Sequence, residues 1–329
     1  MSSQKERLEK YNKAAAALEK ISDQEIIAKL IAAKQIHNGI GGTAVKLEIA
    51  GLLVFAKKIA LTDLEKQNPH STKNLFDLPI YYQYGIGSSG FGIWREIACH
   101  QITTKWVRDG ECLNFPLMYG FKIVRRNQPV EPICEEVVQI RKEFWNDSEQ
   151  VAERLRAIHD AQYDVVIFLE YFPQNLCEYM SPQASEGAHK TMPDMKMVEE
   201  NIKSITDFLG EKGLLHFDSH HGNIVTDGER LYFTDFGLAI FQDFELSVAE
   251  REFFVKHRGY DRALALSCFD WPAKTKDGEI VETLPEVKIV AKKYGGIAKI
   301  MDRFREDLRV DKSKKIEYPA VAILKLLGF

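Results

Sequence analysis

Cysteine is scarce in this sequence, and no pattern would use the few cysteines together. The chain has five cysteines in 329 residues, widely spaced and never in a Cys-x-x-Cys pair. An odd number without paired spacing argues against a disulfide framework and against a zinc knuckle. We therefore expect reduced thiols with structural roles, as is usual in the cytoplasm.

Long apolar runs and an excess of positive charge are also missing. The longest apolar run covers residues 49–56, whereas a membrane span needs about 18 residues. The first ten residues are charged and lack the apolar stretch of a secretory signal. The net charge of −4 gives no support for nucleic-acid binding. These absences predict a cytoplasmic protein that binds neither membrane nor nucleic acid.

The composition is that of a globular protein, and the chain is long for a single hydrophobic core. Apolar residues make up 45% of the chain and charged residues 28%, which excludes disordered and fibrous classes. A length of 329 residues exceeds the usual size of a single core. We therefore expect two lobes or domains.

Residues 1–36 form a segment rich in Ala, Lys, Glu and Leu, which predicts an N-terminal helical extension. Ser22-Asp23-Gln24-Glu25 has the form of a capping box and should open a helix that stops near Asn38-Gly39. The segment could pack on the main domain or bind a partner. Its apolar stripe is broad enough to need cover, which favours packing.

Strands and helices then mix in an order that indicates an α+β fold. Alternating apolar residues over 39–59 predict a hairpin that turns at Ala50-Gly51, and further strands are expected at 120–125 and 164–169. Residues 61–92 are rich in turn formers and are interpreted as a flexible insertion. Helices are predicted at 93–108, within 132–160, up to Lys212-Gly213, and over 248–269, 287–294 and 298–308.

A polar segment at 216–223, His-Phe-Asp-Ser-His-His-Gly-Asn, carries the clearest chemistry. It is followed by a hairpin with a turn at Asp227-Gly228 and then by Asp235-Phe236-Gly237. Asp218 and Asn223 have the H-x-D-x-x-x-x-N spacing found in phosphoryl-transfer enzymes. In that chemistry Asp218 would accept the proton of an acceptor hydroxyl, while Asn223 and Asp235 would bind a divalent metal. His216 is interpreted as a brace that hydrogen-bonds to the backbone.

Two upstream residues fit the same reaction. Lys57 ends the strand motif Val-Phe-Ala-Lys and could pair with nucleotide phosphates, and Glu96 on the following helix is placed to pair with Lys57. Gly39, Gly41 and Gly42 precede that strand and could fold over the phosphates. The glycine pattern is degenerate, since Ala44 and Lys46 replace the glycine and valine expected there.

With these motifs the chain resembles the protein-kinase-like superfamily over roughly residues 37–270. The His-x-Asp-x-His-x-Gly-Asn form is more similar to the aminoglycoside and choline kinases, whereas Asp-Phe-Gly and Phe-Ala-Lys are more similar to protein kinases. Segments 55–58, 61–65 and 91–96 also resemble bacterial proteins described as kinase-like. The resemblance implies a bilobal fold, with a small antiparallel β-rich N-lobe at 37–169 and a larger helical C-lobe at 170–329. It further implies ATP with Mg²⁺ as cofactors and a hinge at Glu170 to Phe172 that contacts the nucleotide.

The acceptor and the class of activity stay open at this point. No Ala-Pro-Glu follows Asp235-Phe236-Gly237, so the platform on which protein kinases dock peptides is missing or rebuilt. This favours a small-molecule hydroxyl acceptor over a protein substrate, with a serine/threonine protein kinase as the alternative. A pseudokinase scaffold is a second alternative. A zinc hydrolase that uses His216, His220, His221 and the aspartates is the third.

Overall fold

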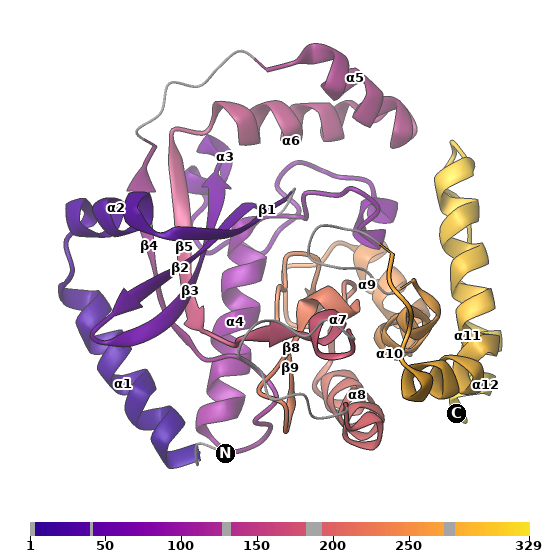
Figure 1. Cartoon of the computed structure of the whole chain (residues 1–329). Helices are drawn as coiled ribbons and strands as arrows, with labels where there is room; N and C mark the ends of the chain where they lie inside the picture. Colours follow the sequence, from indigo (N-terminus) through magenta and orange to yellow (C-terminus); the bar gives the residue numbers. More distant parts are fainter. Residues whose placement is uncertain (1–3, 40–41, 127–132, 182–192, 273–279) are drawn as a thin grey trace. The chain divides into compact units, whose positions relative to one another are not determined.

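The chain, seen here as a computed structural model, has an α+β fold made of two compact units (Figure 1). The structure describes residues 4–39, 42–126, 133–181, 193–272 and 280–329. The first unit contains residues 1–171, 236–238 and 243–247, and the second contains residues 172–235, 239–242 and 248–329. Each unit therefore contains segments that are distant in the sequence.

A five-stranded antiparallel sheet with strand order β1-β2-β3-β5-β4 forms the centre of the first unit. Apolar residues of β3 and β5 alternate between its faces, and one face packs on α4 through Ile93, Trp94 and Ile97. The elements of this unit are α1 (Gln4–Lys20), α2 (Asp23–Ala32), β1 (Lys34–Gly39), β2 (Gly42–Ile49), β3 (Leu52–Leu61), α3 (Asp63–Gln67), η1 (Ile80–Tyr84), α4 (Ile93–Arg108), β4 (Met118–Arg125), α5 (Glu135–Phe144), α6 (Glu149–Asp160) and β5 (Tyr163–Glu170).

The second unit is mostly helical, with two small sheets. Buried residues at helical spacing on α8 (Val198, Ile202, Ile205, Leu209) form part of its core. The three-stranded sheet has the order β6-β8-β9, and β10 pairs with β7. The elements are β6 (Gln174–Asn175), α7 (Leu176–Tyr179), α8 (Met195–Lys212), β7 (Leu214–Leu215), η2 (His221–Asn223), β8 (Ile224–Thr226), β9 (Leu231–Phe233), β10 (Ile240–Phe241), α9 (Val248–Lys256), α10 (Tyr260–Ser267), η3 (Cys268–Asp270), α11 (Pro285–Val310) and α12 (Ala320–Leu327).

Several sequence expectations about single elements are confirmed. The helix predicted at 93–108 is α4, and the stop at Lys212-Gly213 is the left-handed C-cap of α8, with Gly213 at φ 76°. The hairpins around Ala50-Gly51 and Asp227-Gly228 are both present. All five cysteines are free thiols. No helix among the described residues is long and apolar enough to cross a membrane.

Other expectations about elements are wrong. The helix opened by Ser22 ends at Ala32, and residues 34–39 form the edge strand β1, because their pairing with β2 satisfies the backbone that a longer helix would have used. The two helices expected at 287–294 and 298–308 are one helix, α11, which runs through Gly295 and Gly296.

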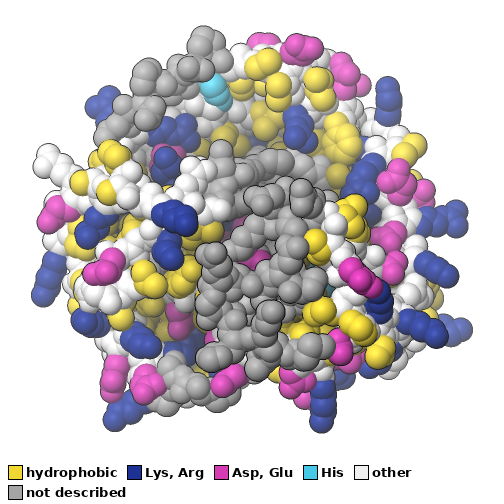
Figure 2. Space-filling model, viewed as in Figure 1, with side chains coloured by type: hydrophobic (Ala, Val, Ile, Leu, Met, Phe, Trp, Pro, Cys, Tyr) yellow, Lys and Arg dark blue, Asp and Glu magenta, His cyan; other side chains and the backbone are white. Residues whose placement is uncertain are grey.

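Charges of both signs are interspersed over the face shown in Figure 2.

Candidate functional site

Lys57 and Glu96 form a buried ion pair in the first unit. Lys57 Nζ lies 2.8 Å from Glu96 Oε1, and the two side chains are only 9% and 5% exposed. The register of the sheet explains the contact. Lys57 lies opposite Ile167 on β5 and so shares the sheet face that packs on α4. Lys58 points to the other face and is 43% exposed. The structure therefore brings these two predicted residues together.

Glu65 fixes the start of the helix that carries Glu96. Its Oε1 accepts a hydrogen bond from the backbone N–H of Ile93, the first residue of α4, and its backbone carbonyl accepts one from Trp94 Nε1. The carboxylate also pairs with Arg154 at 3.0 Å. Burial opposes ionisation of Glu65, but Arg154 and the hydrogen bonds hold its pKa below the ordinary value. A buried negative charge thus caps the N-terminus of α4.

The Phe236-Gly237 part of the Asp-Phe-Gly motif packs within the first unit. The Phe236 ring is fully buried, with its centre 5.1 Å from that of His100, one turn along α4 from Glu96. Gly90 has a φ of 75°, and a Cβ there would collide with the carbonyl oxygen of Gly237. Gly90 is thus required for close packing. The interpretation of its segment as a merely flexible insertion is wrong at this position.

The predicted nucleotide-binding residues of the first unit lie in different settings. Gly39 and Gly42 pair with each other at the end of the β1–β2 hairpin, and Gly41 lies outside the described residues. Glu170 is the last residue of β5, and its carboxylate forms a bidentate ion pair with Arg7 of α1. The Glu170 side chain is therefore engaged within the protein, and the contact of Glu170 with a nucleotide stays a prediction.

Asp218 and Asn223 lie together in the second unit, as their spacing predicted. Asn223 Nδ2 donates hydrogen bonds to Asp218 Oδ2 at 2.8 Å and to the Asp218 carbonyl at 3.0 Å. The β8–β9 hairpin returns the chain to this point, because the Thr234 amide donates to the Asn223 carbonyl. Asp235 follows directly. Phe172, also in this unit, lies 4.1 Å from the Tyr232 ring, centre to centre.

Asp261 of α10 holds the backbone that leads to Asp218. Its two carboxylate oxygens accept hydrogen bonds from the amides of His216 and Phe217, at 2.7 and 2.8 Å. Phe217 has a φ of 61° and Asp235 a φ of 63°, a conformation that is costly for residues other than glycine. Burial raises the pKa of Asp261 to about 6 against the opposing effect of these amides. The fold therefore sustains local strain on both segments of the candidate site.

The Asp218 carboxylate lies in surroundings that raise its pKa. Its pKa is raised above the ordinary value, chiefly because burial disfavours the charged form, and the charge of Asp235 adds to the effect. His220 and Arg305 act in the opposite direction. His220 Nε2 lies 3.8 Å from Asp218 Oδ1, and the Asp218 side chain is 29% exposed. The Asp218 carboxylate is thus largely removed from water, while part of the side chain remains exposed.

Two of the histidines are used by the backbone, which argues against the zinc interpretation. His216 Nε2 lies 2.9 Å from the Thr234 carbonyl and His221 Nε2 lies 2.8 Å from the Ala265 carbonyl, so both nitrogens donate. Burial lowers the pKa of His216 to about 4 and that of His221 to about 3. These Nε2 nitrogens have no lone pair for a metal. His216 Nδ1 accepts a hydrogen bond from the Asp218 amide at 3.2 Å, so both ring nitrogens of His216 are used within the protein. The described ranges contain no group of three His, Cys, Asp or Glu side chains arranged to hold a metal ion.

Comparison with known proteins gives no family assignment. No protein-family model matches the sequence, and no curated protein matches it significantly. The case for a function therefore depends on the geometry of the chain itself.

Three residues that support the candidate site were given no role from the sequence: Glu65, Asp261 and Arg7. The Thr62-x-x-Glu65 spacing is a readable capping box, but nothing in it indicates a second contact with α4. Asp261 stands within a largely apolar helix, and an acidic residue there is a signal for a buried partner. Arg7 gave no signal, because its partners are more than 100 residues away.

Proposed function

We propose that this protein is an ATP- and Mg²⁺-dependent phosphotransferase that transfers the γ-phosphate of ATP to a hydroxyl acceptor. The two units would serve as the N-lobe and C-lobe of a bilobal kinase-like fold. The observation that supports this most is the buried Lys57–Glu96 ion pair at 2.8 Å. It joins the two residues whose pairing this chemistry needs, 39 positions apart in the chain.

In this proposal Lys57 neutralises nucleotide phosphates while Glu96 fixes the direction of its ammonium group. A buried lysine needs such a partner, because an unpaired charge at this depth is costly. Gly39 and Gly42, at the end of the β1–β2 hairpin, would cover the phosphates. The backbone of residues 170–172 would support the base, with the Phe172 ring beside it.

Asp218 orients the acceptor hydroxyl and takes its proton. Oδ2 is held by Asn223, so Oδ1 is the oxygen left to accept from the hydroxyl. The acceptor oxygen forms a bond to the γ-phosphorus while the bond between that phosphorus and the β,γ-bridging oxygen breaks. ADP leaves with that bond's electron pair, and the acceptor's proton passes to Asp218. A raised pKa suits a carboxylate that must accept a proton.

The donors around Asp218 fit a magnesium ion. Mg²⁺ prefers oxygen ligands and is commonly held by one or two carboxylates together with substrate phosphates. Asn223 uses its amide nitrogen within the protein, which leaves its Oδ1 for a cation, and Asp235 supplies a carboxylate. When bound there, the ion would neutralise phosphate charge during transfer. Asp235 and Asn223 are held for this task by the hairpin and the Asp218 contacts.

A small-molecule acceptor is favoured over a protein substrate. The chain passes from Gly237 through the short strand β10 to α9, which begins at Val248, within eleven residues. No Ala-Pro-Glu segment occurs in that interval. A protein kinase and a pseudokinase are the outcomes against which the proposal is tested.

The direct test measures ATP binding and phosphate transfer with the purified chain. Calorimetry with ATP, with and without Mg²⁺, is compared among the wild type, Asp235→Ala and the exposed control Asp243→Ala. We expect Mg²⁺-dependent binding that Asp235→Ala abolishes and Asp243→Ala leaves intact. Labelled ATP is then incubated with a metabolite extract and, in parallel, with a protein extract.

The outcomes separate the classes of function. Label in a small molecule supports the proposal in full, and label only in proteins would make the chain a protein kinase. Nucleotide binding without transfer to either extract would indicate a pseudokinase. If zinc raises the thermal stability of the protein and calorimetry shows no binding of ATP, the proposal is overturned in favour of a hydrolase.

A further inference from the structure

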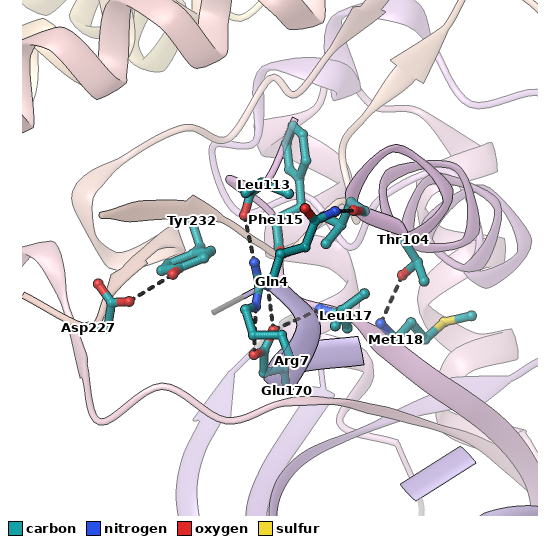
Figure 3. A network of polar contacts seen from close by, with 11 residues as sticks. Gln4, Arg7, Thr104, Leu113, Phe115, Leu117, Met118, Glu170, Asp227 and Tyr232 are labelled. Atoms are coloured by element: carbon teal, nitrogen blue, oxygen red, sulfur yellow. Dashed lines mark hydrogen bonds and ion pairs between the residues drawn. The ribbon is translucent and has the colours of Figure 1, made fainter. Parts of the chain in front are cut away.

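The N-terminal helix α1 is fastened to the end of β5 by one side chain. Arg7 Nε lies 3.0 Å from Glu170 Oε1, and Arg7 Nη2 lies 2.6 Å from Glu170 Oε2 (Figure 3). The two side chains are only 5% and 16% exposed. A bidentate pair of this kind fixes both position and direction. Arg7 thus controls the orientation of the Glu170 side chain.

The same guanidinium also orders the segment before β4. Arg7 Nη1 donates to the Leu113 carbonyl at 3.0 Å, and Nη2 donates to the Phe115 carbonyl at 2.9 Å. The Leu117 amide donates to Glu170 Oε2, and the Glu170 amide donates to the Leu117 carbonyl. Arg7 therefore binds both chain segments that meet at the exit of β5.

The position of this network in the chain gives it a functional meaning. Glu170 is the last residue of β5, and Tyr171 is the last residue of the first unit before Phe172 begins the second. Residues 170–172 are the ones that the proposed function assigns to the nucleotide base. Without Arg7, the Glu170 carboxylate at the end of β5 would be a largely buried negative charge without its guanidinium partner.

We propose that Arg7 is a positioning residue for the nucleotide: through Glu170 it fixes the backbone of residues 170–172 and neutralises the carboxylate there. This inference rests on the proposed function. It makes α1 part of the nucleotide-binding unit, in place of a separate extension. The rest of α1 is docked independently, because Leu18 is buried against β4, where a Cβ on Gly120 would lie 3.1 Å from its Cδ2.

The test compares Arg7→Met, Arg7→Lys and Glu170→Gln with the wild type by ATP–Mg²⁺ calorimetry and steady-state kinetics. We expect Arg7→Met and Glu170→Gln to raise the Kd and KM for ATP about tenfold or more, the effect of losing a buried charge-assisted contact, with kcat changed less than twofold. Arg7→Lys should recover part of the affinity, because lysine keeps the charge but lacks the planar fork.

Two controls separate positioning from stability. Lys5→Met removes the same charge from an exposed position on α1, and it should leave the Kd unchanged. Leu18→Ala loosens α1 without touching the network, so it should lower Tm with a smaller effect on the Kd than Arg7→Met. In hydrogen exchange, the amides of Leu117 and Glu170 should lose protection in Arg7→Met and keep it in Lys5→Met.

The inference is overturned if the wild type binds ATP and the Arg7→Lys and Glu170→Gln variants bind it with the same Kd. These conservative variants decide the question even where Arg7→Met fails to fold. If the wild type does not bind ATP, the proposed function is contradicted, and the inference is contradicted with it. The two failures are therefore distinguishable.

Discussion

Glu65 Oε1 accepts a hydrogen bond of 2.9 Å from the backbone amide of Ile93, and this contact joins the end of β3 to the start of α4. Glu65 lies just after β3, the strand that carries Lys57, and Ile93 begins α4, the helix that carries Glu96. The carboxylate therefore helps to fix the strand and the helix whose side chains form the buried ion pair.

Replacing Glu65 by Ala should destabilise the protein strongly. The change removes the cap of α4 and leaves Arg154 as an uncompensated buried charge, which costs about 3–5 kcal/mol. The matched control is Glu25→Ala, which removes the same capping-box residue from α2 at an exposed position. Urea unfolding of both variants measures the difference. Equal losses for the two would show that burial of Glu65 has no special effect.

Gly90→Ala should disturb the Asp-Phe-Gly segment, whereas Gly51→Ala should not. Both glycines have nearly the same φ, 75° and 77°, so the strain of about 1–2 kcal/mol from the left-handed conformation is shared. Only Gly90 faces the backbone of Gly237, while Gly51 has open space. We expect lower ATP–Mg²⁺ affinity and turnover in Gly90→Ala alone. Identical activity in the two variants would refute this.

Removing one member of the Lys57–Glu96 pair should cost more than removing both. Lys57→Met removes the lysine partner of the buried Glu96 carboxylate, at a cost of about 3–5 kcal/mol, and Glu96→Met has the converse effect. The double variant should recover much of this stability, because apolar groups of similar size can replace a buried pair. It should still lack ATP binding. Additive losses in a double-mutant cycle measured by denaturation would contradict the expectation.

Turnover should depend on pH through Asp218. Asp218→Ala should keep ATP affinity and lose about a hundredfold or more in kcat, as expected for a lost general base. The pKa of Asp218 is raised by burial, so the acidic limb of the kcat profile should lie above the range of an ordinary aspartate. His220 lowers this pKa, so His220→Ala should move the limb to still higher pH. A limb that stays in place or moves to lower pH would refute the role of His220.

Acid should destabilise the fold through its buried histidines. The pKa of His221 is about 3 in the folded protein, because burial disfavours the charged ring, and about 6.5 when unfolded. The unfolded state therefore binds more protons between these values. Stability is complete above pH 6.5 and falls as the pH decreases, by about 1.4 kcal/mol per pH unit for each such histidine.

His221→Gln tests this, since glutamine keeps an N–H donor for the Ala265 carbonyl and does not titrate there. The slope of unfolding free energy against pH, measured between pH 6 and pH 4, should decrease by about 1.4 kcal/mol per unit. His216 and His257, with pKa values lowered to about 4, should account for part of the remaining slope.

The sequence by itself determined most of the elements and the contacts set by local spacing. Capping signals and glycine stops located α4 and the end of α8, and the H-x-D-x-x-x-x-N spacing placed Asp218 beside Asn223. Such features depend on residues a few positions apart, whose geometry the chain restricts strongly. The predicted end of α2 was wrong because residues 34–39 pair with β2, and this pairing overrides the local helical preference.

Only the tertiary structure decided how charges far apart in the chain are used. Strand register places Lys57 on the face of the sheet that meets Glu96, and helix docking places Arg7 against Glu170. Glu170 therefore pairs with an arginine that the sequence could not identify as its partner. The physical reason is that a buried charge requires a partner, and packing decides which distant residue can reach it.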